Sequence, residues 1–263
     1  MDLTIRTAFA RALSAGVLVC ASSLPALAEA APAPDDEWHF QVAPYMWFAG
    51  VKGTLSVRGI VDVPVDVPFD DVISNFDVGL LAHFEGRKHR AGFAMDVLYL
   101  SLSAPVADSA PVLAQLDISA DVRLAMIEGL GFYRVATGGR SHNPSHLDVI
   151  AGVRYFGTRA RLEDDALQTG ELKLHWVDAL VGARFRVSLG SRVALLGRGD
   201  IAGFGSKFTW NVEGDLAVLL SQHWSLGAGW RHLDVDYGKD DGADRRLFDV
   251  AFDGPRAWFN YSW

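Results

Sequence analysis

Charged side chains recur at alternate positions of otherwise apolar segments, and they are the first candidates for chemistry. Asp178 and Arg184, for example, alternate with Val177, Ala179 and Val181. Because successive side chains of a β-strand point to opposite faces, such a segment places charge on one face and aliphatic groups on the other. The charged face predicts an interior set made up of Asp96, Asp121, Arg123, Asp148, Arg154, Asp178, Arg184, Arg198, Asp200, Glu213, Asp215 and Arg231.

Both signs of charge are well represented in this set, and two interpretations follow. If the strands close into a narrow barrel, an unpaired charge inside it would cost several kcal/mol, so the set favours an arginine–carboxylate network that fills the interior and fixes the strand register. The alternative is a charged, narrow passage for small solutes. Glu128 has the opposite parity to Arg123 on the same segment, which predicts a bulge near Ile127 or a position close to the membrane interface.

The best candidate for catalysis is His232, with Asp234 two residues away or with Asp70 and Asp71 on another connection. A histidine beside a carboxylate could act as a general base in a hydrolase at the barrel rim. Such pairs often occur by chance, and we expect no enzyme, with this hydrolase as the alternative. The other histidines lack metal-ligand spacing, so neither a metal site nor a cofactor is expected.

Acidic residues gather in two predicted connections, which solvated loops would explain. The alternative is that their oxygens bind divalent cations that bridge to lipopolysaccharide. These residues are Asp62, Asp66, Asp70 and Asp71 in one connection and Asp234, Asp236, Asp240, Asp241 and Asp244 in the other.

The elements that must position these side chains are long strands with a period of two. A tilted strand needs about 9–11 residues to cross a bilayer, and most of the segments exceed that length. Short turns alternate with longer connections, as in bacterial outer-membrane barrels that have both termini on the periplasmic side. A hairpin at Gly50–Gly53 would change the count, so eight to twelve strands are possible. The ten predicted strands are 38–58, 76–87, 91–103, 117–136, 146–161, 171–188, 192–204, 207–221, 224–236 and 246–263.

The N-terminus has the features of a cleaved secretory signal. Arg6 and Arg11 precede a short apolar run, and Ala26 and Ala28 fit the small-residue positions of a cleavage site. Cys20 is the single cysteine and lies in this leader, so the mature chain would hold no disulfide. We therefore predict a signal peptide at 1–28, a Pro/Ala-rich tether at 29–37 and an outer-membrane barrel at 38–263.

The composition agrees with a membrane barrel and excludes other classes. The 263 residues are 50% hydrophobic and 11% aromatic, and the net charge is −8. Nucleic-acid binding is not expected, because it requires a basic face. Aromatic residues near the strand ends predict the interfacial girdles of a membrane barrel. They are Trp38, Tyr45, Trp47, Phe48, Tyr99, Phe132, Tyr133, Tyr155, Phe156, Trp176, Phe185, Phe208, Trp210, Trp224, Trp230, Phe259 and Tyr261.

The chain ends on an aromatic residue, with Phe259, Tyr261 and Trp263 on one face of the last strand. The apolar set Phe248, Val250 and Phe252 has the opposite parity, so a bulge at Asp253–Pro255 is predicted if both sets face lipid. Arg256, Trp258 and Asn260 are then expected in the lumen.

This ending resembles the terminal signal by which outer-membrane barrels are recognised for assembly. The layout resembles the small OmpA/OmpW-type outer-membrane barrels, and Ala43–Thr54 is similar to the opening strand of an uncharacterised proteobacterial barrel family. The resemblance implies a single, monomeric, antiparallel up-and-down barrel whose partners are outer-membrane lipid, lipopolysaccharide and the barrel-assembly machinery. The expected function is structural or a narrow passage for small solutes, and the alternative is surface binding or adhesion through the outer loops. Fold alone does not choose between these functions.

Overall fold

The computed structural model describes residues 36–56, 63–68, 76–105, 118–140, 143–164, 170–239 and 246–263. The chain divides into two units, residues 1–35 and residues 36–263. The leader, with Ala26 and Ala28, lies outside the described residues, as do Asp70 and Asp71. Within the described part, no helix is long and apolar enough to span a membrane.

The second unit is built from antiparallel strands. They are β1 (His39–Trp47), β2 (Gly50–Ser56), β3 (Val63–Val67), β4 (Phe76–Lys88), β5 (Ala91–Pro105), β6 (Ile118–Arg140), β7 (Asn143–Asp164), β8 (Gly170–Ser188), β9 (Val193–Gly203), β10 (Phe208–Leu219), β11 (Trp224–Lys239) and β12 (Arg246–Ser262). β1 and β2 lie within the predicted segment 38–58, β4 to β12 follow the other nine predicted segments, and β3 was not among the predicted strands.

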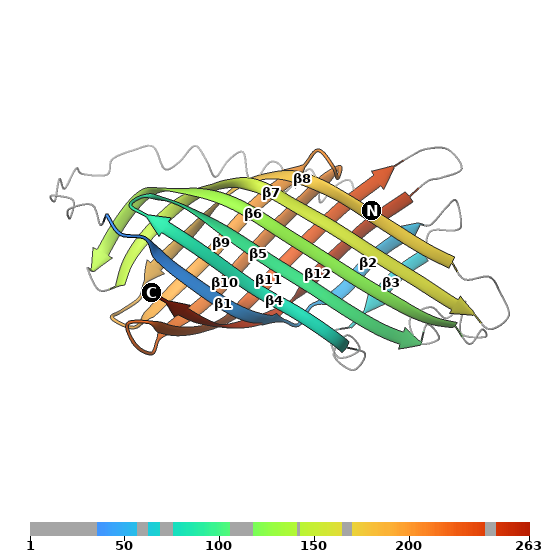
Figure 1. Ribbon diagram of the computed structural model, residues 1–263, viewed down its shortest axis with the longest axis horizontal. Helices are drawn as coiled ribbons and strands as arrows, with labels where there is room; N and C mark the ends of the chain where they lie inside the picture. The colour runs from blue at the N-terminus through green and yellow to red at the C-terminus, as the bar shows by residue number, and fades with distance from the viewer. Residues whose placement is uncertain are drawn as a thin grey trace, which may run out of the picture. The chain divides into compact units, whose positions relative to one another are not determined.

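The strands close into a ring (Figure 1). Neighbours in the sequence pair from β4 to β12, and β1 completes the ring by pairing with both β4 and β12. The barrel therefore has ten strands, and β2 and β3 extend it along β12. Closure leaves the ring without the unpaired edge that would otherwise template aggregation.

β1 and β2 act as one long strand against β12. Trp47 faces Arg256 and Gly50 faces Asp253, so the register is the same on both sides of the short break between them. The hairpin considered at Gly50–Gly53 is therefore absent, and the chain turns back only between β2 and β3.

The two ends of the barrel differ. At one end, which we call the short-turn end, β4 and β5 are joined at His89 and Arg90, and the terminal strands meet. There the amide of Phe40 donates to the carbonyl of Trp263 at 2.9 Å, and the amide of Trp263 donates back to Phe40 at 3.0 Å. The opposite end, which we call the long-connection end, carries the longer links between strands.

The predicted bulge at Asp253–Pro255 is wrong. β11 and β12 pair without a register shift from Trp224 opposite Tyr261 to Lys239 opposite Arg246. Phe248, Val250 and Phe252 therefore share the inner face with Arg256, and all three are buried. The prediction failed because it took every apolar face to be a lipid face, whereas part of this lumen is itself apolar.

The outer face of the ring is apolar around its circumference. Because these side chains are exposed although they belong to long regular strands, the ring presents a continuous apolar surface such as a bilayer would cover. The exposed set includes Leu80, Met95, Ile127, Val149, Val153, Val177, Val181, Leu195, Ile201, Val212, Leu216, Leu226, Trp230 and Phe259.

The aromatic residues divide between the two faces. Tyr99, Tyr155, Trp224 and Trp230 are exposed on the outside, as the girdle prediction requires. Other members of the predicted girdles are buried inside the barrel, which corrects their assignment. These inward aromatics are Tyr45, Trp47, Phe132, Phe156 and Trp176.

Candidate functional site in the barrel lumen

A row of polar side chains crosses five neighbouring strands in register. His83 on β4 faces Asp96 on β5, and Asp96 faces Glu128 on β6. Glu128 then faces Arg154 on β7, and Arg154 faces Asp178 on β8. Strand pairing alone thus places charges of both signs side by side on the inner wall.

Glu128 and Arg154 form the centre of the lumen network. The Arg154 Nε donates to Glu128 Oε1 at 2.7 Å, and its Nη2 donates to Asp200 on β9 at 2.6 Å. The side chains of Glu128, Arg154 and Asp200 are fully shielded from solvent, with 0% exposure. A buried guanidinium held between two carboxylates has its charge compensated within the protein, as burial demands.

The network continues to the opposite wall. Arg198 on β9 donates to Glu128 Oε2 at 2.7 Å and lies 2.8 Å from Asp200. Arg231 on β11 lies 3.6 Å from Glu128 and 3.4 Å from Glu213 on β10. β6 and β11 are five strands apart whichever way the ring is followed, so the contact between Glu128 and Arg231 spans the lumen.

Two further groups tie β10, β11 and β12 into this layer. The Asn211 amide donates to Asp200 at 3.0 Å and to Glu213 at 3.1 Å, and its carbonyl accepts from Arg231 Nε at 2.9 Å. Arg256 pairs with Glu213 at 2.6 Å and also with Asp215. We call the set Glu128, Arg154, Arg198, Asp200, Asn211, Glu213, Asp215, Arg231 and Arg256 the central network.

A second ionic cluster lies nearer the short-turn end. Arg184 on β8 donates to both Glu85 oxygens, at 2.5 and 3.1 Å, and to Asp148 at 3.1 Å. Arg134 on β6 donates to the other oxygen of Asp148 at 2.9 Å. The Arg184 guanidinium also stacks over the Phe132 ring, 4.1 Å from its centroid. A bidentate arginine thus joins β4 and β8 across the lumen.

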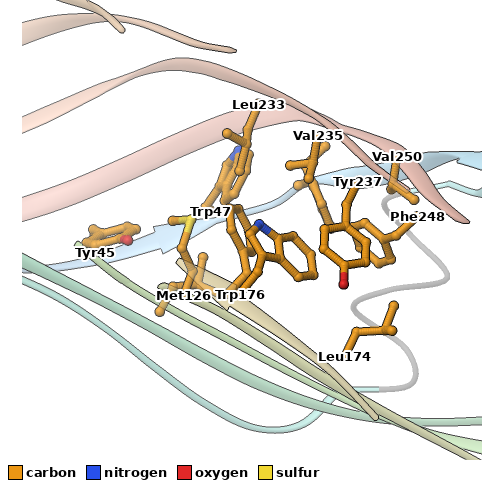
Figure 2. Close-up of a cluster of buried hydrophobic side chains, with 14 residues drawn as sticks. Tyr45, Trp47, Met126, Leu174, Trp176, Leu233, Val235, Tyr237, Phe248 and Val250 are labelled. Carbon is orange, nitrogen blue, oxygen red and sulfur yellow. The ribbon is translucent and has the colours of Figure 1, made fainter. Parts of the chain in front are cut away.

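The lumen toward the long-connection end is apolar. Trp176 on β8 stacks on Phe156 at 5.0 Å between ring centroids. It also stacks on Tyr237, at 4.3 Å (Figure 2). Phe248 packs at a tilt against Trp176, at 5.7 Å. We call this buried group the aromatic cluster; it comprises Tyr45, Trp47, Ala49, Leu98, Met126, Phe156, Leu174, Trp176, Leu233, Val235, Tyr237, Phe248, Val250 and Phe252.

The stack of Trp176 and Tyr237 lies where the barrel wall is incomplete. The ladder between β8 and β9 ends at Ala179 opposite Gly203, so Trp176 lies beyond the last β9 partner. Likewise, β10 and β11 stop pairing at Phe208 opposite Asp236, one residue short of Tyr237. The stacked rings therefore join β8 to β11 beyond the ends of β9 and β10, where those two strands no longer lie between them.

Asp178 holds that short link in place. Its Oδ1 accepts from the backbone amides of Gly205 and Ser206 at 3.0 and 2.6 Å, and its Oδ2 accepts from the Trp176 indole at 3.1 Å. The carboxylate thus takes over the hydrogen bonds that a strand partner would supply. Asp178 was predicted from parity, but its contact with this turn was not.

The structure places the predicted network residues as follows. Asp96, Asp148, Arg154, Asp178, Asp200, Glu213, Asp215 and Arg231 are buried on the inner face, and Arg184 and Arg198 are half-buried beside them. Arg123 is a wrong assignment, because it is exposed on the outer face of β6. The side chain of Asp121 lies outside the described part. Glu128 is a second correction, since it lies at the centre of the lumen and no bulge interrupts β6 at Ile127.

Both errors come from one strand. On β6 the inward face carries Met126, Leu130 and Phe132, and the outward face carries Arg123. Polarity therefore misassigns the two faces of this strand. The signal that could have found Glu128 is cross-strand pairing, because aligning β6 with β7 places Glu128 opposite Arg154.

His232 lies on the outer face of β11 and pairs with a different carboxylate from the predicted ones. Its Nδ1 lies 2.9 Å from Asp253 Oδ1 on β12, and the same oxygen accepts from the Trp230 indole at 2.9 Å. The Trp210 ring lies 4.5 Å from the imidazole. Asp234 follows on the same face of β11. Among the described residues, no group of three or more His, Cys, Asp or Glu side chains could hold a metal ion.

The closed ring, its apolar outer surface and its ionic interior define an outer-membrane-type β-barrel. No protein-family model matches the sequence, and no curated protein is significantly similar to it.

Solved structures that resemble the chain are bacterial outer-membrane barrels. The attachment invasion locus protein Ail of Yersinia pestis is 8% identical, covers 86% of this chain and 98% of its own, and has a TM-score of 0.38. The translocator domain of the autotransporter NalP from Neisseria meningitidis is 14% identical, with 98% and 95% coverage and a TM-score of 0.43. Neisserial surface protein A is 13% identical, with 85% and 96% coverage and a TM-score of 0.33. These scores are low, so the architecture of this chain rests on its own strand pairing and surface.

Proposed function

We propose that the protein is an outer-membrane barrel with a lumen closed by side chains, and that it contributes to envelope structure through its wall and outer surface. The supporting observation is the contact between Glu128 and Arg231, which joins opposite walls with both side chains buried. A ten-stranded barrel has a slim interior, because eight strands are already filled by their own side chains.

Two layers in series support a structural role over solute passage. The central network is ionic, and each of its arginines lies within 4 Å of a carboxylate, whereas the aromatic cluster is apolar. A hydrated solute would have to separate buried ion pairs and then cross a layer of stacked rings. Each step is costly, since opening a buried pair leaves uncompensated charge.

Conductance of the refolded barrel in a planar bilayer tests this proposal. We expect insertion without stable open-channel steps, in samples whose unboiled form migrates faster than the boiled form on a gel. Stable ohmic steps from such samples would support the narrow-passage role instead. The absence of a mobility shift, together with a soluble periplasmic location, would contradict the barrel itself.

A hydrolase is the second candidate function, favoured by the imidazole–carboxylate pair of His232 and Asp253. The pair lies on the outer face beside Trp210 and Trp230, and aromatic residues of this kind favour a membrane interface. A general base there would act on lipid or on a surface peptide. Hydrolysis of fluorogenic phospholipids and peptides by the wild type, lost in both His232→Ala and Asp253→Asn, would establish it.

A further inference from the structure

A row of cationic side chains crosses the outer face of three neighbouring strands. Arg123 on β6 faces Arg159 on β7, and Arg159 faces Lys173 on β8. All three residues are exposed, and the residues that flank them on β7 and β8, Thr158 and Leu174, are buried on the inner face. We call Arg123, Arg159 and Lys173 the basic row.

The basic row lies just beyond the apolar belt. Ile127, Tyr155 and Val177 form an exposed row on the same three strands, also in register. On each of these strands, the member of the basic row lies four residues from the member of the apolar row, toward the long-connection end. The charge therefore begins where the apolar surface ends.

Tyr155 marks this boundary directly. A Cβ atom added to Gly157 would lie 2.8 Å from the Tyr155 hydroxyl, so the tyrosine ring leans along β7 toward Arg159 with its polar tip foremost. A tyrosine with an apolar body in the belt and a hydroxyl at its edge has the orientation expected at a lipid headgroup layer. His175, exposed between Val177 and Lys173 on β8, adds a further polar group at the same level.

The three cations occupy adjacent register positions on neighbouring strands, which are roughly 5 Å apart, so one anionic headgroup could contact more than one of them. The arrangement stands out in a chain whose net charge is −8.

We propose that the basic row binds the phosphate groups of a glycolipid in the outer leaflet, the lipid A portion of lipopolysaccharide. A phosphate monoester carries up to two negative charges and several acceptor oxygens, and guanidinium groups bind it through paired hydrogen bonds. The headgroup would lie along β6, β7 and β8, with its acyl chains against Ile127, Tyr155 and Val177. This site rests on the proposed outer-membrane location, with the long-connection end outside the cell.

Binding of a fluorescent bisphosphorylated lipid A to the purified full-length protein in detergent micelles tests the site. The triple variant Arg123→Gln, Arg159→Gln, Lys173→Gln is expected to bind about tenfold to 100-fold more weakly, given the contribution of each cation near an anionic surface. The matched control is Lys88→Gln, Arg90→Gln, Arg192→Gln, which removes the same charge at the short-turn end and should leave the affinity within about twofold. Arg123→Lys with Arg159→Lys keeps the charge and should retain most of the binding.

Two further probes identify the ligand. Lipid A stripped of both phosphates should bind the wild type and the triple variant equally weakly. Inorganic phosphate should not displace lipid A at millimolar concentration, because it lacks the acyl chains.

Equal lipid A binding by the triple variant and its control would overturn the proposal, as would equally tight binding of inorganic phosphate. The gel-mobility shift on boiling is measured for each variant, and a variant without the shift is replaced by its three single substitutions. If the triple variant shows a normal mobility shift but unchanged lipid A binding, the proposed lipid A site is contradicted and the barrel is not. If the wild type shows no shift, the barrel on which the site depends is contradicted.

Discussion

Glu128 on β6 and Arg231 on β11 approach to 3.6 Å across the lumen, although their strands lie on opposite sides of the ring. Both side chains are buried, and each has other partners within the central network. The contact shows that the central network spans the lumen between opposite walls of the barrel.

Removing the charge of Glu128 should destabilise the barrel strongly. Glu128→Ala removes one of the two carboxylates that Arg154 and Arg198 share and leaves only Asp200, so the central network keeps an uncompensated buried charge at a cost of about 3–5 kcal/mol. The free energy of unfolding, measured by urea titration in lipid vesicles, checks this. Asp66→Ala is the control, because Asp66 pairs with Lys52 in an exposed ion pair, and its loss should cost about 0–1 kcal/mol. Equal losses in the two variants would contradict the central role of Glu128.

The two lumen layers should act as barriers in series. Glu128→Ala with Arg231→Ala removes the contact across the central network without changing the net charge, and Trp176→Ala with Tyr237→Ala removes the bridging stack. We expect negligible conductance in either double variant and stable channels only in the combined variant, because water enters a polar space once large side chains are gone. Planar-bilayer recording of heat-modifiable protein provides the measurement. Full conductance from the first pair alone would show that the aromatic cluster is no barrier.

Gly152 and Gly129 should respond oppositely to alanine, although they lie on paired strands. A Cβ at Gly152 would overlap the carbonyl oxygen of Gly129, whereas a Cβ at Gly129 meets only Val153 Cγ2, at 4.0 Å. Gly152→Ala must push β6 and β7 apart and should cost about 1–3 kcal/mol. Gly129→Ala should be neutral or slightly stabilising, since it restricts the unfolded chain. Urea midpoints of the two variants provide the comparison, and a larger loss for Gly129→Ala would refute the packing argument.

Trp263 should matter more for assembly in the cell than for the stability of the finished barrel. We expect Trp263→Ala to slow insertion by the barrel-assembly machinery, because the terminal aromatic set of Phe259, Tyr261 and Trp263 is then incomplete. Spontaneous refolding in detergent should change little, since the backbone bonds between Phe40 and residue 263 persist. Trp263→Phe should restore the rate. Pulse-chase gel mobility in cells and in detergent separates the two effects, and equal slowing in both would argue against a recognition signal.

The sequence by itself determined the strands. An alternation with a period of two repeats along the chain, and it predicted all ten barrel strands close to their observed bounds, because side-chain direction in a strand depends only on local backbone geometry. It also placed Asp148, Arg154, Asp178, Asp200 and Asp215 correctly on the inner face.

Only the tertiary structure decided which partners these strands bring together. Parity separates the two faces of a strand but does not say which face lines the lumen. On β6 the charge of Arg123 suggested the wrong inner face, and on the first half of β12 the apolar side chains suggested a lipid face where the lumen lies. Glu128 and Arg231 are far apart in the sequence and belong to strands that never pair, so no local pattern could join them. Closure of the ring brings them together, because it sets the lumen diameter that their side chains must cross.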